Sequence, residues 1–80
     1  MPEISRYQGV IFYIHPESLG NQKHNLPHIH AWYQGQVVIL DLEGNILEGR
    51  LPKKKLRLAQ KWVMMNKEYC LLQWNIYCGG

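Results

Sequence analysis

The sequence has no apolar run long enough to cross a membrane. Its longest runs, Val10–Ile14 and Val37–Leu40, are far shorter than the roughly 20 residues that a spanning helix needs. The first residues, M-P-E-I-S-R, also lack the charged-then-apolar pattern of a signal peptide. These absences predict a cytoplasmic protein with no membrane partner.

Cysteine and metal-binding motifs are scarce. The chain contains neither C-x-x-C nor H-E-x-x-H, and its two cysteines are Cys70 and Cys78. If both lie on one helix, their Cα atoms are roughly 12 Å apart, beyond the ~7 Å that a disulfide allows. We therefore expect free thiols, and we assign no cofactor and no metal ligands from these motifs.

The composition indicates one globular domain over residues 1–80. Hydrophobic residues make up 46% of the chain and charged residues 19%, which excludes the disordered class. The net charge of +3 is mildly basic and does not by itself indicate a nucleic-acid partner. The position of the charges must decide that question.

The first half of the chain has the features of an antiparallel sheet. β-branched and aromatic residues form short runs that glycine, proline and asparagine separate. Consecutive runs joined by short turns favour a meander. We predict strands at Gly9–His15, His28–Gln34, Gln36–Leu42 and Ile46–Arg50, with a surface loop over 16–27.

The second half has the features of two helices. Pro52 suits a helix start, and over Lys53–Met65 the apolar residues share one face while lysine and arginine occupy the other. Asn66 favours a break, after which Lys67–Tyr77 forms a second helix. The sequence thus predicts an α+β fold: a four-stranded antiparallel meander over about residues 8 to 50, then two C-terminal helices packed on one face.

Three segments resemble those of one protein family. They are M-P-E-I-S-R at residues 1–6, P-H-I-H-A at 27–31 with Tyr33 after it, and I-L-E-G-R-L-P at 46–52. The chain is similar to small bacterial proteins catalogued as a domain of unknown function, family forty-one-sixty. The second motif of that family usually reads N-P-P-H-I-H-A-x-Y, so Leu26 replaces a proline here. The resemblance implies a component of a two-gene, toxin–antitoxin-like module, and it implies no reaction.

The last predicted helix is apolar almost all round. An 80-residue protein cannot surround such a helix, so part of it should meet another chain. We expect either a homodimer or a complex with the protein encoded beside it in the operon. The residues predicted at this contact are Leu71, Leu72, Trp74, Ile76 and Tyr77.

His28 and His30 are the first candidate site. On a strand they share a face with Trp32, and we expect them to be partly exposed, with one imidazole near a carboxylate or a tyrosine hydroxyl. Histidine titrates near neutral pH and suits acid–base catalysis, in which Glu48 would orient an imidazole. Two alternatives remain open. One is a metal site completed by His15, His24 or Glu48, and the other is a hydrogen-bonded structural pair.

The second candidate is a basic cluster around the first helix. Cations at a helix N-terminus oppose the macrodipole, and like charges at i, i+4 repel, so these residues are kept at a cost in stability. The cluster is predicted to bind RNA phosphates, together with Trp32 as a stacking residue. Tyr7, Tyr13 and Tyr33 are further aromatic side chains that could stack on bases, with packing at the core or its rim as the alternative. The alternatives are an ordinary solvated face and an acidic protein partner. The predicted nucleic-acid-binding residues are Arg50, Lys53, Lys54, Arg57, Lys61 and Trp32, with Lys55 in the same cluster.

Three interpretations of function follow. The first is a toxin–antitoxin-like component that binds or acts on RNA, with the basic helix holding phosphates and the histidine pair facing them. The second is a non-catalytic interaction module that docks on its operon partner through the last helix. The third is a metal-binding module that uses His28 and His30. Whether the protein is an enzyme stays open at this point.

Overall fold

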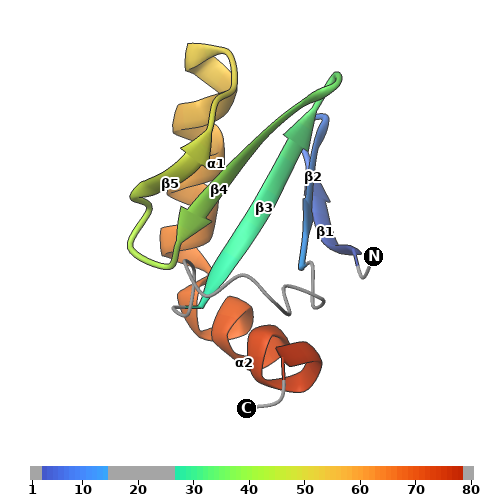
Figure 1. Ribbon diagram of the computed structural model, residues 1–80, viewed down its shortest axis with the longest axis vertical. Helices are drawn as coiled ribbons and strands as arrows, with labels where there is room; N and C mark the ends of the chain where they lie inside the picture. Colours follow the sequence, from blue (N-terminus) through green and yellow to red (C-terminus); the bar gives the residue numbers. More distant parts are fainter. Residues whose placement is uncertain (1–2, 15–26, 79–80) are drawn as a thin grey trace.

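A five-stranded antiparallel sheet and two helices form the protein (Figure 1). The computed structural model describes residues 3–14 and 27–78. Its strands pair in sequence order, β1-β2-β3-β4-β5, and both helices follow them. The elements are β1 (Glu3–Tyr7), β2 (Val10–Tyr13), β3 (His28–Tyr33), β4 (Gln36–Asp41), β5 (Ile46–Gly49), α1 (Lys53–Met65) and α2 (Lys67–Cys78). The predicted α+β meander followed by two helices is confirmed.

The predicted number of strands is wrong by one. β1 extends the sheet at its outer edge and pairs with β2 over Glu3–Tyr13. Its sequence, E-I-S-R-Y, contains a single aliphatic residue, so it carries little of the alternation that marks a half-buried strand. The pairing depends instead on the turn at Gln8 and Gly9. The predicted end of the next strand, His15, and the predicted loop over 16–27 lie outside the described residues, except for Pro27.

Two hairpin turns share the dipeptide Gln-Gly. Gln8 and Gly9 have φ angles of 54° and 83°, and Gln34 and Gly35 have 47° and 84°. Positive φ at both central residues is the geometry of a type I′ turn, whose twist matches that of the flanking strands. The short turn expected between the strands predicted at 28–34 and 36–42 is confirmed at Gly35, and Gln34, which was predicted to end a strand, belongs to the turn.

Gly49, the last residue of β5, has a backbone conformation that favours glycine. Its φ is +84°, and a Cβ atom there would lie 2.3 Å from the backbone oxygen of Val37. That oxygen instead accepts a hydrogen bond from the backbone N–H of Arg50, at 3.1 Å. The glycine of the I-L-E-G-R-L-P motif therefore serves the backbone geometry of this edge.

One face of the sheet carries the core. Every second side chain of the central strands is buried against α1, which contributes Ala59 and Val63. The rings of Phe12 and Trp62 stack with centroids 4.1 Å apart and fix the angle of α1 on the sheet. The buried sheet residues are Val10, Phe12, Ile14, Ile29, Ala31, Val38 and Leu40.

α1 ends at the predicted break. The side-chain amide of Asn66 donates to the backbone oxygen of Trp62 at 2.8 Å, and its backbone N–H donates to the same oxygen at 3.0 Å. Asn66 therefore satisfies a carbonyl at the C-terminus of α1, and its own backbone oxygen accepts from the N–H of Cys70 at 2.9 Å, the first helical bond of α2.

The sequence suggested that α2 would pack beside α1 on one face of the sheet, and this arrangement is not found (Figure 1). Instead, α2 lies across the end of the sheet where β3 begins (Figure 1). The Tyr69 hydroxyl donates to the backbone oxygen of Ile4 in β1 at 2.8 Å, and Trp74 reaches His28, with ring centroids 4.6 Å apart. α2 therefore contacts β1 through Tyr69, and it contacts the sheet face opposite α1 through Trp74.

α2 also carries both cysteines. Cys70 is a free thiol in the core, and burial raises its pKa to about 11.

Within the described part of the chain, neither helix combines the length and the apolarity that a bilayer crossing demands.

Candidate functional site

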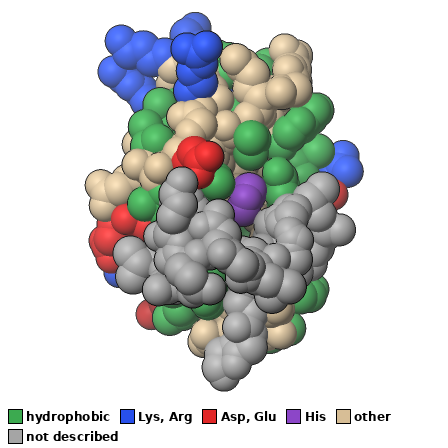
Figure 2. All heavy atoms as spheres, viewed as in Figure 1, with side chains coloured by type: hydrophobic (Ala, Val, Ile, Leu, Met, Phe, Trp, Pro, Cys, Tyr) green, Lys and Arg blue, Asp and Glu red, His purple; other side chains and the backbone are tan. Residues whose placement is uncertain are grey.

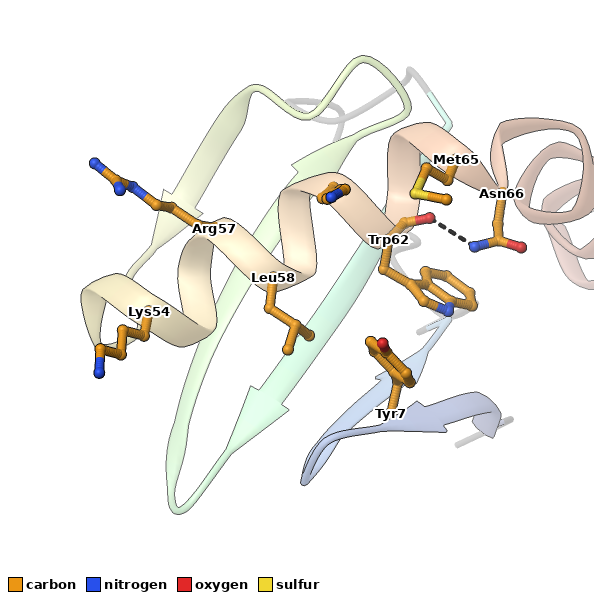
Figure 3. A pocket seen from close by; sticks show the side chains of 8 residues that line it. Tyr7, Lys54, Arg57, Leu58, Trp62, Met65 and Asn66 are labelled. Atoms are coloured by element: carbon orange, nitrogen blue, oxygen red, sulfur yellow. Dashed lines mark hydrogen bonds between the residues drawn. The ribbon is translucent and has the colours of Figure 1, made fainter.

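Three basic side chains of α1 line one groove. Lys54, Arg57 and Lys61 follow one another at i, i+3 and i+7, so they form a single stripe along the helix. The groove beside them has a volume of about 510 Å³ (Figure 3). None of the three forms an ion pair with another residue of the described chain. Their charges are therefore available to an external anion.

Aromatic residues form the other wall of the groove. Tyr7, the last residue of β1, points toward the indole of Trp62 (Figure 3). The phenol is 48% exposed. Trp62 is held in place because its ring stacks on Phe12 and meets the edge of Tyr69 at 6.5 Å between centroids. The groove thus combines exposed positive charges with a packed aromatic surface.

The start of α1 is electrostatically unfavourable. Its first turn contains no acidic residue, and Pro52 at the N-cap offers no side-chain hydrogen bond. Three consecutive lysines lie there instead, at 53–55. Both the macrodipole and the exposed N–H groups favour a negative charge at this position. Packing of Ala59 and Val63 keeps the helix in place despite its first turn.

One lysine of the predicted cluster has a structural role. The ammonium of Lys55 donates to the backbone oxygen of Gln8 at 2.7 Å and lies 5.0 Å from the centroid of the Tyr33 ring. It therefore ties the β1–β2 turn to α1 and supports the wall that presents Tyr7. Arg50 and Lys53 are exposed near the start of α1 but do not line the groove.

His28 and His30 lie on the opposite face of the sheet. Their ring centroids are 5.6 Å apart, and the ring of His30 stacks on Tyr13 at 5.0 Å. His28 is only 3% exposed, and Trp74 of α2 packs against it, so the expectation that both imidazoles reach solvent is wrong for His28. His30 is partly exposed.

Glu48 and Trp32 also belong to this second face. Cross-strand pairing places Tyr13, His30, Ile39 and Glu48 in one row across four strands. Ile39 therefore separates His30 from Glu48. Trp32 lies in the adjoining row, opposite Val37. Figure 2 views this face: a histidine side chain lies among hydrophobic ones, with an acidic side chain nearby.

The two predicted sites do not converge. The basic groove lies on the α1 side of the sheet, since Tyr7 pairs with the buried Val10. The histidines and Trp32 lie on the other side. Most of the lysine and arginine side chains visible in Figure 2 gather at one end of the molecule, away from the histidine. The fold therefore does not form a single site in which the histidine pair faces phosphates held by α1.

The sequence of one protein family matches most of the chain. The family is described as "Domain of unknown function (DUF4160)", and the match covers residues 9–75. The chain belongs to this family. No curated protein and no solved structure matches the chain. Membership in DUF4160 brings no activity with it, so the function must be argued from the residues.

The DUF4160 match includes both candidate sites, with one exception. The basic stripe, Trp62, the histidines and Glu48 all fall within it, whereas Tyr7 lies just before its first residue. Sequence reasoning singled out Tyr7 as a stacking candidate but assigned Trp62 to the core. Its place beside Lys61, at the border between the apolar and basic faces of α1, is the signal that could have identified it.

Asp41 organises a turn of the DUF4160 domain. Its carboxylate accepts hydrogen bonds from the backbone N–H groups of Glu43 and Asn45, each at 2.9 Å. Burial alone would raise its pKa, but these bonds, with those of the Asn45 side chain and the Gly44 backbone, outweigh burial and lower it. The carboxylate thus stabilises the β4–β5 turn.

A metal site is not evident in this part of the DUF4160 chain. Among residues 3–14 and 27–78, no group of three or more histidine, cysteine, aspartate or glutamate side chains could hold an ion. Two of the third ligands considered from the sequence, His15 and His24, lie outside these ranges.

Proposed function

We propose that this protein binds RNA through the groove on α1, as the cytoplasmic component of a two-gene, toxin–antitoxin-like module. The observation that carries the proposal is the stripe of Lys54, Arg57 and Lys61 beside an exposed aromatic wall. The module assignment is supported by the sequence resemblance alone.

Phosphate binding explains why α1 keeps its charges. Three cations in one groove repel one another, and those near the helix start oppose the macrodipole. Residues that lower stability without a packing role are usually retained for function. A nucleic-acid backbone would remove the repulsion and release counterions, which favours binding.

Binding, rather than catalysis, is the activity that this proposal assigns. His28 is covered by Trp74, and His30 lies on the face of the sheet opposite the groove. Neither imidazole can therefore act on a strand held by α1 of the same molecule. We propose that His28 is structural, and that catalysis by His28, His30 and Glu48 would need a substrate on the other face.

The exposed side of α2 favours a second function, docking on another protein. Leu72 and Ile76 are 56% and 60% exposed, and Tyr77 is 42% exposed. Past Glu68 the helix carries no charged residue. Such a surface fits a second copy of the chain or the operon partner. Light scattering of the protein alone, and after co-expression with its neighbour, distinguishes these two partners.

RNA titration with charge-matched variants tests the proposed function. Fluorescence anisotropy of a labelled RNA of about 10 nucleotides gives the affinity of the wild type. We expect Lys54→Gln/Arg57→Gln to weaken binding severalfold more than Arg50→Gln/Lys53→Gln, which removes the same charge outside the groove. Equal effects of the two variants would show that only net charge matters. Absence of binding by the wild type would refute the proposal.

The module assignment has its own test. Controlled expression of the protein in bacteria, alone and with its operon neighbour, is scored by growth. Growth arrest that the neighbour relieves would support the assignment, and unimpaired growth under both conditions would contradict a toxic role.

A further inference from the structure

We infer that the groove accepts a single strand of RNA, with one base stacked on the wall formed by Tyr7 and Trp62 while the basic stripe holds neighbouring phosphates. This inference rests on the proposed function and names the class of RNA. It assigns the aromatic wall a role that the phosphates alone do not require.

The geometry of the wall suits a base. Tyr7 presents a half-exposed ring at the end of β1, beside the indole of Trp62 (Figure 3). Trp62 is packed between Phe12 and Tyr69, so it cannot turn away when the groove is filled. A rigid aromatic surface loses little conformational freedom on binding, and every base has a face that can stack on it.

The turn that follows Tyr7 in the chain is also fixed by contacts. Gln8 and Gly9 form the type I′ hairpin, and Lys55 donates to the backbone oxygen of Gln8 at 2.7 Å. The ring of Tyr7 is therefore attached to a backbone that is fixed on both sides, by β2 and by α1. This arrangement positions the phenol against the groove before any ligand arrives.

The dimensions of the groove favour a single strand over a duplex. Its volume of about 510 Å³ is that of a small-molecule site. In a duplex the bases are stacked inside and their faces cannot reach a concave wall, whereas the bases of a single strand can be splayed out onto aromatic rings. The aromatic wall would then contribute nothing to duplex binding.

The length of the basic stripe sets the footprint. Lys54 and Lys61 are separated by about 10 Å along the helix axis, at 1.5 Å per residue. At the ~3.4 Å rise of a stacked strand, this distance spans about three phosphates. The logarithm of the affinity should therefore fall with the logarithm of salt concentration with a slope of about −2, since each phosphate contact on a single strand contributes about −0.7.

The test compares two substitutions at Tyr7 on three RNA probes. The probes are a labelled single strand of about 10 nucleotides, an abasic strand of the same length, and a hairpin duplex. Tyr7→Leu removes the ring, and Tyr7→Phe keeps it. Both changes are at a half-exposed side chain, and thermal melting checks that each variant folds.

We expect Tyr7→Leu to weaken binding of the single strand about tenfold, within the range for loss of one stacked base. Tyr7→Phe should bind like the wild type. On the abasic strand, Tyr7→Leu and the wild type should bind equally, and the salt slope should be the same for both. The wild type should prefer the single strand to the duplex.

Two results would overturn the inference, and each is distinct from failure of the proposed function. If Tyr7→Leu binds the single strand as tightly as the wild type does, no base stacks on this wall. If the wild type prefers the duplex, the groove does not select a single strand. In both cases RNA binding itself would stand. If no probe binds the wild type, the proposed function and the inference both fail.

Discussion

Replacement of Lys54 by glutamate should stabilise the protein while it weakens RNA binding. Lys54 is the second residue of α1, in a first turn with no acidic residue and no side-chain cap. Exchange of a cation for an anion at this end of a helix changes the interaction with the macrodipole twice, by about 0.3–1 kcal/mol for each charge. Glutamate would also attract Arg57, where lysine repels it, for a further ~0.2–0.5 kcal/mol each way.

The summed effect is an increase of at least about 1 kcal/mol in the free energy of unfolding, even with the lower value of each contribution. For a domain of this size, that corresponds to a rise of roughly 4–8 °C in Tm. Differential scanning calorimetry at low ionic strength measures it. Lys54→Gln, which only removes the cation, should give about half the rise, and high salt should reduce both gains.

An unchanged or lower Tm for Lys54→Glu would refute the argument that α1 keeps its lysine at a cost in stability. A rise in Tm together with unchanged RNA affinity would confirm the electrostatic cost of Lys54 but contradict its role in RNA binding. The helix would then be electrostatically unfavourable, as described, but not because of the ligand that we propose.

Three further predictions concern stability. Gly49→Ala should lower the free energy of unfolding by at least about 3 kcal/mol in chemical denaturation, because its Cβ would meet a backbone oxygen at 2.3 Å. Gly35→Ala, with the same φ and open space around it, should lower it by only about 1 kcal/mol. Similar losses for the two variants would contradict the steric argument. His28→Ala should lower the free energy of unfolding by about 2 kcal/mol, since the imidazole is buried under Trp74, and an unchanged Tm would argue against a structural role. Because the pKa of Asp41 is lowered, its stabilising effect is present above the ordinary carboxyl pKa of about 4 and is lost as pH falls through the folded-state value. The difference in stability between the wild type and Asp41→Asn should therefore vanish in acid. A difference that does not depend on pH would refute this prediction.

Local pattern predicted most of the elements. The helical period over Lys53–Met65 placed both the core face and the basic face of α1, and the two-residue period of β3 placed His28, His30 and Trp32 together. β1 was missed because E-I-S-R-Y has almost no alternation of its own and is stabilised by pairing with β2.

Contacts between distant segments account for what the sequence could not predict. His28 is buried and packs against Trp74, and nothing near the histidine in the sequence indicates that α2 would cross the end of the sheet. In the same way, the basic stripe was predictable from α1 alone, but its aromatic wall depends on β1 bringing Tyr7 beside Trp62. The separation of the two candidate sites follows from which face α1 covers.

Photo-crosslinking of a single-stranded RNA to the protein, with the linked residue identified by mass spectrometry, shows which face of the sheet binds RNA. We predict cross-links at Tyr7 or Trp62, the aromatic residues of the groove. Cross-links at Trp32, on the opposite face of the sheet, would contradict RNA binding in the groove and would favour the face that carries the histidines.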